Sequence, residues 1–179
     1  FQNHKLDILM ESTKVELDRI DFRILEALSA DGRMSDVALG ESINLSSTAV
    51  ARRRRIMEES GIIAGYNANL SLQALGFSGV VIVMVELRSQ AEHILDEFEH
   101  EVVKCPSISY CGFISGDTDF IIMIHVSSLD EYDDIYRREL SNLPHVAKIR
   151  SSFVLREVAR RATVPIIFER GKKQTNGRA

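Results

Sequence analysis

The first third of the chain repeats its apolar residues every three and four positions, which is the spacing of an amphipathic helix. From Leu17 to Leu28 these residues form one stripe, and Asp18 lies where a side chain can cap the N-terminus of the helix. Asp31 and Gly32 end the pattern, because both residue types favour turns. The sequence therefore predicts a first helix between Asp18 and Asp31.

Two further helices are expected directly after it. Ser35 and Ser46 are the N-cap candidates of a short second helix and of a third helix that runs to about Ser60. Asn44 lies where the chain must turn between them, and asparagine tolerates the left-handed conformation better than most residues. Gly61 suits the position after the third helix. Three short helices with a tight turn before the third are the layout of a helix-turn-helix.

The remainder of the chain is richer in β-branched and apolar runs. Residues 62–70 are predicted to form a short strand, the wing of a winged helix-turn-helix, and residues 80–87 indicate a buried strand. The expected elements are a strand at 80–87, a helix at 94–102, a hairpin of two strands at 108–115 and 120–126, a helix at 129–143 and a last strand at 146–155. This β-α-β-β-α-β order predicts a ferredoxin-like domain, so the fold class is α+β.

Composition narrows the class of protein. Apolar residues make up 45% of the chain and charged residues 27%, which is ordinary for a globular protein. The longest apolar run, 80–85, is too short to cross a membrane, and the start of the chain does not resemble a signal peptide. Cys105 and Cys111 fit neither a zinc motif nor a disulfide framework, so a reducing cytoplasm is expected.

Motifs of catalysis are missing from the sequence. It contains neither a phosphate-cradling glycine loop with a lysine nor a G-x-S-x-G turn. The pair Asp117 and Asp119 is more typical of turn chemistry than of a metal site. We therefore expect a protein that is not an enzyme and that carries no cofactor and no metal.

Candidate DNA contacts lie on the third predicted helix. The net charge is −4, yet four consecutive arginines occupy residues 52–55. A recognition helix places its N-terminal residues against base edges, and phosphates lie within reach one turn later. The hydroxyl side chains expected at bases or phosphates are Ser46, Ser47 and Thr48. The arginines expected at phosphates are Arg52, Arg53 and Arg55. The alternative is a solvated arginine face on a helix of purely structural importance.

A second candidate site is the turn between the hairpin strands. Gly116, Asp117 and Asp119 place two carboxylates beside a glycine at one end of the predicted sheet. A carboxylate can hold an α-ammonium group, and exposed backbone N–H groups can hold an α-carboxylate. The turn therefore suits a molecule of the size of an amino acid, although a plain hairpin turn, with Asp119 as a local cap, explains the same residues.

The chain resembles the Lrp/AsnC (leucine-responsive/asparagine-responsive) family of transcription regulators over residues 17–158. The matching pieces occur in order, and they are Leu17-Asp18-x-x-Asp21-x-x-Ile24-Leu25, Asp31-Gly32-Arg33-x-Ser35, Leu45-Ser46-x-Thr48, Gly61-Ile62-Ile63-x-Gly65-Tyr66, Leu75-Gly76 and Gly116-Asp117-x-Asp119. Each piece is short, but their shared order and spacing are specific.

The resemblance implies an effector-modulated, sequence-specific DNA-binding regulator. It implies dimers formed through the sheet, with tetramers or octamers as larger assemblies, and an amino-acid effector bound between dimers near the turn. By position, the effector site includes Gly116, Asp117 and Asp119, with Ser151 and Ser152 of the last strand as weaker candidates. Double-stranded DNA, further copies of the chain and the effector are the expected partners, and no membrane is expected.

The expected domain division follows from both arguments. It comprises an N-terminal tail, a winged helix-turn-helix domain, a linker, a ligand-binding and oligomerisation domain and a C-terminal tail, at residues 1–16, 17–66, 67–78, 79–158 and 159–179. Ferredoxin-like folds host many functions. Two alternatives therefore stay open, which are a regulatory module of an amino-acid-metabolising enzyme and an architectural DNA-binding protein without an effector.

Three residues depart from the family pattern. Arg54 stands where an apolar residue is usual and would share the buried stripe with Val50 and Met57, so its side chain must snorkel or pair. Asn44 replaces a common glycine, which the turn can accept. Gly40 replaces a frequent alanine within the second helix, at a cost of roughly 1 kcal/mol in helix propensity.

Overall fold

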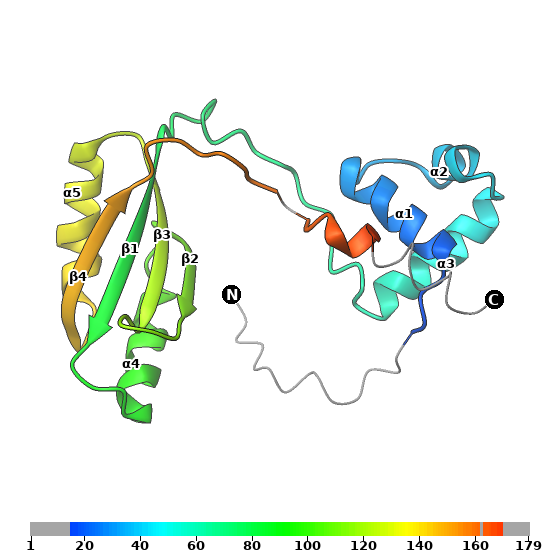
Figure 1. The fold of residues 1–179 in the computed structure, drawn as a ribbon. Helices are drawn as coiled ribbons and strands as arrows, with labels where there is room; N and C mark the ends of the chain where they lie inside the picture. The colour runs from blue at the N-terminus through cyan, green and yellow to red at the C-terminus, as the bar shows by residue number, and fades with distance from the viewer. Residues whose placement is uncertain (1–14, 162, 170–179) are drawn as a thin grey trace. The chain divides into compact units, whose positions relative to one another are not determined.

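The computed structural model describes residues 15–161 and 163–169, and the chain divides into two compact units. Of the described residues, 70–159 form one unit, and 15–69 with 160, 161 and 163–169 form the other (Figure 1). The division falls inside the predicted linker. Most of the predicted N-terminal tail, residues 1–14, and residues 170–179 of the predicted C-terminal tail lie outside the described residues.

The three predicted helices form the core of the first unit, and residues 166–169, predicted as part of the C-terminal tail, add a short helical turn to it. The three helices are α1 (Arg19–Ala30), α2 (Asp36–Ile43) and α3 (Ser47–Glu59). Their apolar stripes meet in one buried core made of Ile24, Leu28, Leu39, Ile43, Val50 and Met57. Burial of this apolar surface is the main force that holds three such short helices together, because isolated helices of this length are marginal in water.

The predicted caps define the ends of these helices. Asp18 accepts hydrogen bonds from the backbone N–H groups of Ile20 and Asp21, and the Asp21 carboxylate accepts one from the Asp18 N–H in return. The hydroxyls of Ser35 and Ser46 cap α2 and α3. Each cap satisfies N–H groups that the first turn of a helix leaves unpaired.

The turn between α2 and α3 explains two of the departures from the family pattern. Asn44 adopts the left-handed conformation at φ 57°, as the sequence predicts. Gly40 is required by a close approach of the chain, because a Cβ atom there would lie 2.4 Å from the carbonyl oxygen of Leu45. The glycine therefore does more than lower helix propensity, since it leaves room for the backbone of the turn.

The predicted wing strand at residues 62–70 is wrong as secondary structure. Gly61 leaves α3 at φ 74°, and the chain then runs without regular structure to residue 71. The N–H of Ile63 bonds to the carbonyl oxygen of Met57, and Ile63 packs against the helical core. A strand requires a paired neighbour, and within the described residues this segment has none.

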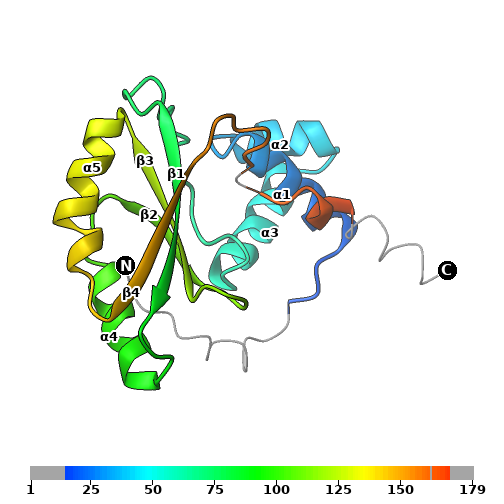
Figure 2. The same cartoon turned by 60° about the vertical axis from the view of Figure 1, so that its left-hand side comes forward.

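The second unit has the predicted β-α-β-β-α-β order. Its elements are β1 (Gly79–Leu87), α4 (Glu92–Val102), β2 (Ile108–Phe113), β3 (Phe120–Val126), α5 (Leu129–Arg138) and β4 (Val146–Phe153). The helix predicted to reach residue 143 ends earlier, and a short 3-10 turn follows at Leu140–Asn142. The strands form one antiparallel sheet in the order β2-β3-β1-β4, with both helices on the same face (Figure 2).

Alternation along the strands divides the sheet into two faces. The face under α4 and α5 is fully buried, with Val81, Val83 and Val85 of β1 beside Ile122 and Ile124 of β3. The opposite face is apolar but only partly buried, and its central residues are Val80, Ile82, Met84, Ile121 and Met123. Within the described residues, no helix has the length and apolar character needed to span a membrane.

Candidate functional site

The N-terminal end of α3 exposes a row of small hydroxyl side chains. Ser46 and Thr48 are exposed and their hydroxyls lie 3.2 Å apart, while Ser47 is partly exposed. The Ser46 hydroxyl also accepts the Ala49 N–H at 3.3 Å, so the cap and the row belong to one turn of helix. Small residues here let a helix approach DNA closely, which is how a helix-turn-helix contacts base edges.

The arginines of α3 do not share one environment. Arg52 is exposed, and no hydrogen bond or ion pair of its side chain occurs within the described part of the chain. Arg55 is also exposed and forms only a helix-surface pair with Glu59, at 3.3 Å. Both guanidinium groups are therefore available to phosphates, because surface pairs of this kind contribute little.

Arg53, by contrast, is engaged within the unit. Its Nη1 atom donates to Asp18 Oδ2 and to Asp21 Oδ1, both at 2.8 Å, and only 22% of its side chain is exposed. Burial raises the pKa of Asp18, whereas hydrogen bonds from the Asp21 N–H and from Arg53 lower it. The lowering effects together are larger, so the pKa lies below its ordinary 3.8. Arg53 thus joins α3 to the capped end of α1 through Nη1, and only its remaining N–H groups are without a partner among the described residues.

Arg54 is paired, as its place on the buried stripe requires. Its guanidinium lies 3.2 Å from Asp36 Oδ1 and 3.2 Å from Glu58 Oε1, with 21% of the side chain exposed. The four arginines therefore divide into an exposed pair, 52 and 55, and an inward pair, 53 and 54. The sequence predicted that Arg54 must snorkel or pair, but it missed the pairing of Arg53, because the partners of Arg53 lie at the start of α1.

The turn predicted to bind an effector is held together by Asp119. That carboxylate is 5% exposed, and it accepts the Leu87 N–H and the Gln90 Nε2 group, both at 2.7 Å. Gly116 adopts φ 128°, a region that favours glycine, and Asp117 is exposed. The exposed chemistry of the turn is thus that of Gly116 and Asp117, while Asp119 faces the end of β1.

Two residues missed by sequence reasoning also surround this turn. Gln90 follows β1 and donates to Asp119, and Arg150 of β4 donates to the Thr118 hydroxyl at 3.2 Å. Arg150 also lies 3.9 Å from Glu86, so a cation stands beside the turn. Neither residue carries a local sequence signal, because each meets the turn through the pairing of distant strands.

Ser151 and Ser152 lie away from the turn within one chain. They are opposite Val83 and Ile82 of β1, which separates their strand from β3, and they face opposite sides of the sheet. The Ser151 hydroxyl shares a short hydrogen bond with the Tyr132 hydroxyl of α5. Within the described residues neither serine bonds to the turn, although Arg150 of the same strand donates to Thr118.

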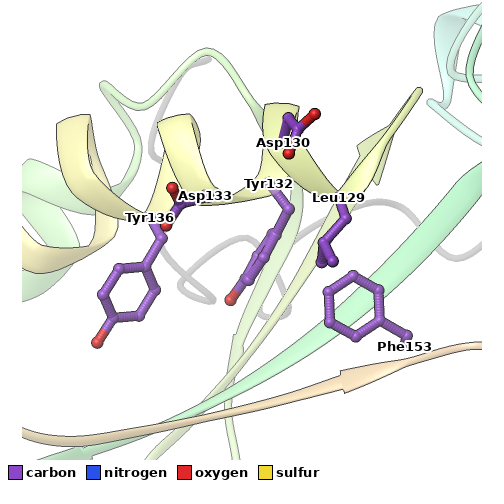
Figure 3. Close-up of a pocket in the computed structure, with 6 residues that line it drawn as sticks. All are labelled: Leu129, Asp130, Tyr132, Asp133, Tyr136 and Phe153. Carbon is purple, nitrogen blue, oxygen red and sulfur yellow. The ribbon is translucent and has the colours of Figure 1, made fainter.

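A groove not predicted from the sequence lies between α5 and β4. It has a volume of about 390 Å³ and is lined by Leu129, Asp130, Tyr132, Asp133, Tyr136 and Phe153 (Figure 3). The rings of Tyr132 and Phe153 meet edge to face at 5.2 Å, and Asp133 pairs with Arg137. The signal in the sequence was the spacing of Leu129, Tyr132 and Tyr136, which also suits an ordinary core stripe.

Both units match known protein families. Residues 17–64 match the family described as winged helix-turn-helix DNA-binding, and residues 80–164 match the family described as the Lrp/AsnC ligand binding domain. The first match contains the helices α1–α3, and the second contains the four-stranded sheet apart from Gly79.

Full-length relatives share this arrangement. The Bkd operon transcriptional regulator of Pseudomonas aeruginosa is 38% identical over 84% of this chain and 99% of its own length. The leucine-responsive regulatory protein of Rhizobium meliloti is 34% identical over 81% of this chain and 93% of its own. The proline dehydrogenase transcriptional activator of Rhodobacter capsulatus is 38% identical, with 79% and 91% covered. These relatives are named as regulators of transcription, not as enzymes.

Solved structures agree with these matches. A transcriptional regulator from Neisseria meningitidis, solved as a complex with L-Met, superposes with a TM-score of 0.79 at 28% identity and covers 84% of this chain and 97% of its own. An AsnC family transcriptional regulator from Agrobacterium tumefaciens superposes with a TM-score of 0.80 at 26% identity, with 85% and 99% covered. With a winged helix-turn-helix unit, a ligand-binding unit and relatives that match almost end to end, the chain belongs to the Lrp/AsnC family of DNA-binding transcription regulators.

Proposed function

We propose that this regulator binds specific DNA sequences and that an amino acid modulates its binding or its assembly. The observation that carries the proposal is the exposed N-terminal turn of α3, where Ser46 and Thr48 precede the exposed guanidinium groups of Arg52 and Arg55. Hydroxyls at bases supply sequence choice, and arginines at phosphates supply affinity. Arg53 would join these contacts through the N–H groups that Asp18 and Asp21 leave free.

The effector belongs to the second unit in this proposal. The relative from Neisseria meningitidis was solved with L-Met, and this chain shares its ligand-binding fold. Gly116 and Asp117 offer an open backbone and a carboxylate, and Arg150 stands nearby for an α-carboxylate. Asp119 supports this turn through Leu87 and Gln90, and Ser151 and Ser152 would join the site from another subunit.

Self-association follows from the open face of the sheet. Val80, Ile82, Met84, Ile121 and Met123 form an apolar surface that α4 and α5 do not cover. A second copy of the sheet is the partner that we propose for it, because soluble proteins rarely leave such a surface in water. The dimer would present two recognition helices to a palindromic operator in the cytoplasm, and larger assemblies such as tetramers or octamers would build on it.

One experiment tests this function. Thermal-shift measurements with each free amino acid, starting with L-methionine, should reveal a ligand that raises the melting temperature, because it binds only the folded state. DNA binding is then measured with and without each ligand found. An affinity for DNA that no amino acid changes would favour the effector-independent architectural protein, and the absence of any preference among DNA sequences would contradict the specific regulator.

A further inference from the structure

Among the side chains of α3, that of Arg54 makes the largest set of hydrogen bonds and ion pairs. Only 21% of it is exposed, against 75% of Arg55 beside it. It lies beyond the N-terminal turn of the helix and faces the rest of its own unit. Its guanidinium joins three segments that are separate in the sequence, which are α3 itself, the start of α2 and the extended chain after α3.

Two nitrogen atoms of the guanidinium, Nη1 and Nε, bind the start of α2 and α3 itself. Nη1 donates to Asp36 Oδ1 at 3.2 Å and to the Met34 carbonyl oxygen at 3.4 Å, at the beginning of α2. Nε donates to Glu58 Oε1 at 3.2 Å, one turn further along α3. The planar fork of an arginine can serve such divergent acceptors, whereas a lysine brings a single ammonium group.

The third segment is held through Tyr66. Arg54 Nε lies 2.8 Å from the Tyr66 hydroxyl, and the guanidinium carbon lies 4.7 Å from the centre of the tyrosine ring. The same hydroxyl donates to Glu58 at 2.7 Å. Tyr66 also borders the turn after α1, because a Cβ atom at Gly32 would lie 3.5 Å from its ring. Burial and the bond to Glu58 raise the pKa of Tyr66, so its hydroxyl stays protonated and can donate.

We propose that Arg54 is a positioning residue for DNA recognition, because it ties the start of α2 and the chain at Tyr66 to the recognition helix without touching DNA. Residues 64–70 have no strand partner in the described part of the chain, so side-chain contacts hold this segment. The network fixes the orientation of the N-terminal turn of α3, and specific contacts depend on that orientation more than phosphate contacts do. The inference rests on the proposed sequence-specific binding.

The test compares three variants of the full chain, which are Arg54→Met, Arg54→Lys and Tyr66→Phe. Binding is measured over a range of salt concentrations, at a temperature where circular dichroism shows each variant folded. One duplex is selected from a random library by the wild-type protein, and the other is a scrambled duplex of equal length. We expect Arg54→Met to weaken binding to the selected duplex about tenfold and to the scrambled duplex less than about twofold, because coupled networks have effects of this size. The salt slope stays unchanged.

The other two variants examine geometry. Arg54→Lys keeps the charge but not the fork, and should be nearly as weak as Arg54→Met. Tyr66→Phe keeps the ring under the guanidinium and removes the hydroxyl, so its specificity should fall about threefold. A double variant that combines Arg54→Met with Tyr66→Phe should lose less specificity than the product of the two single losses. Tyr66→Phe also decides the matter if Arg54→Met fails to fold.

Arg55→Met is the matched control, because Arg55 is exposed on the same helix. It should weaken both duplexes alike and reduce the salt slope by about 0.9, the signature of a lost phosphate contact. The same signature in Arg54→Met would overturn the inference, as would equal losses on both duplexes or unchanged specificity. A wild-type protein without any preference for the selected duplex would overturn the proposed function as well, so the two failures are distinguishable.

Discussion

The carboxylate of Asp119 accepts the backbone N–H of Leu87 at 2.7 Å and so joins the start of β3 to the end of β1. The same carboxylate accepts the Gln90 side chain, and Asp119 is 5% exposed. One buried backbone N–H and the side chain of the exposed residue Gln90 thus depend on one acidic side chain at the turn where an effector is proposed to bind.

Asp119→Ala should therefore lower the free energy of unfolding by about 1–3 kcal/mol, because the buried Leu87 N–H loses its partner. Asp117→Ala is the matched control, since Asp117 is exposed, and it should change stability by less than about 0.5 kcal/mol. Urea unfolding measures both. Calorimetric titration of folded Asp119→Ala with the effector then shows whether Asp119 also contacts the ligand, and an unchanged affinity would exclude it from the site.

Gly40→Ala should destabilise the first unit even though alanine favours helices. The new Cβ would lie 2.4 Å from the Leu45 carbonyl oxygen, a clash that the backbone of the turn must relieve. We expect a net loss of about 1–3 kcal/mol in the free energy of unfolding, as for other overpacked sites. In Gly32→Ala the new Cβ meets the Tyr66 ring at an ordinary 3.5 Å, so stability should hardly change. Equal stability of the two variants would contradict the close approach.

Arg52→Met and Arg53→Met should change different properties, the first the salt dependence of DNA binding and the second the stability of the fold. Arg52 is exposed, and its loss should reduce the slope of log affinity against log salt by about 0.9, without loss of stability. Arg53 is bound to Asp18 and Asp21, so its loss should lower the melting temperature and leave the slope unchanged. A reduced slope in folded Arg53→Met would show that Arg53 also contacts a phosphate.

Asp18 should make the first unit sensitive to acid. Its pKa in the folded protein lies below its ordinary 3.8, so the charged form stabilises the fold above that value. This contribution is lost as the pH falls from 3.8 through the lower, folded pKa. Asp18→Asn keeps a capping oxygen but not the charge, and should cost about 1 kcal/mol or less at pH 7 and a smaller amount at pH 2. Thermal melts at both pH values, with Asp117→Asn as the control, measure the difference, and a cost that is independent of pH would refute it.

Cys111 should react slowly with thiol reagents. Burial raises its pKa to about 11, and Glu99 and Cys105 add to the effect. At pH 8 only about one in a thousand Cys111 side chains is then a thiolate, the reactive form. Alkylation of the native Cys105→Ala variant, followed by mass spectrometry, should be far slower than alkylation of the same variant in denaturant. Equal rates in both conditions would contradict the raised pKa.

Local interactions determined what could be read from the sequence alone. The caps Asp18, Ser35 and Ser46, the left-handed Asn44 and the apolar, β-branched runs of β1 and β3 act between residues close in the chain. Each is a preference of the residue type itself, so the three helices, the order of helices and strands along the chain and the family followed from the sequence. The structure confirms the predicted α+β class.

Tertiary structure decided which of these residues are free to act. The run at 52–55 reads as one basic patch, yet carboxylates of α1 and α2 engage Arg53 and Arg54 and leave Arg52 and Arg55 exposed. Asp119 likewise turns toward Leu87, and the groove beside Phe153 exists only because α5 packs across β4. The physical reason is common to all of them. The direction of a side chain depends on partners far along the chain, and no local pattern encodes those partners.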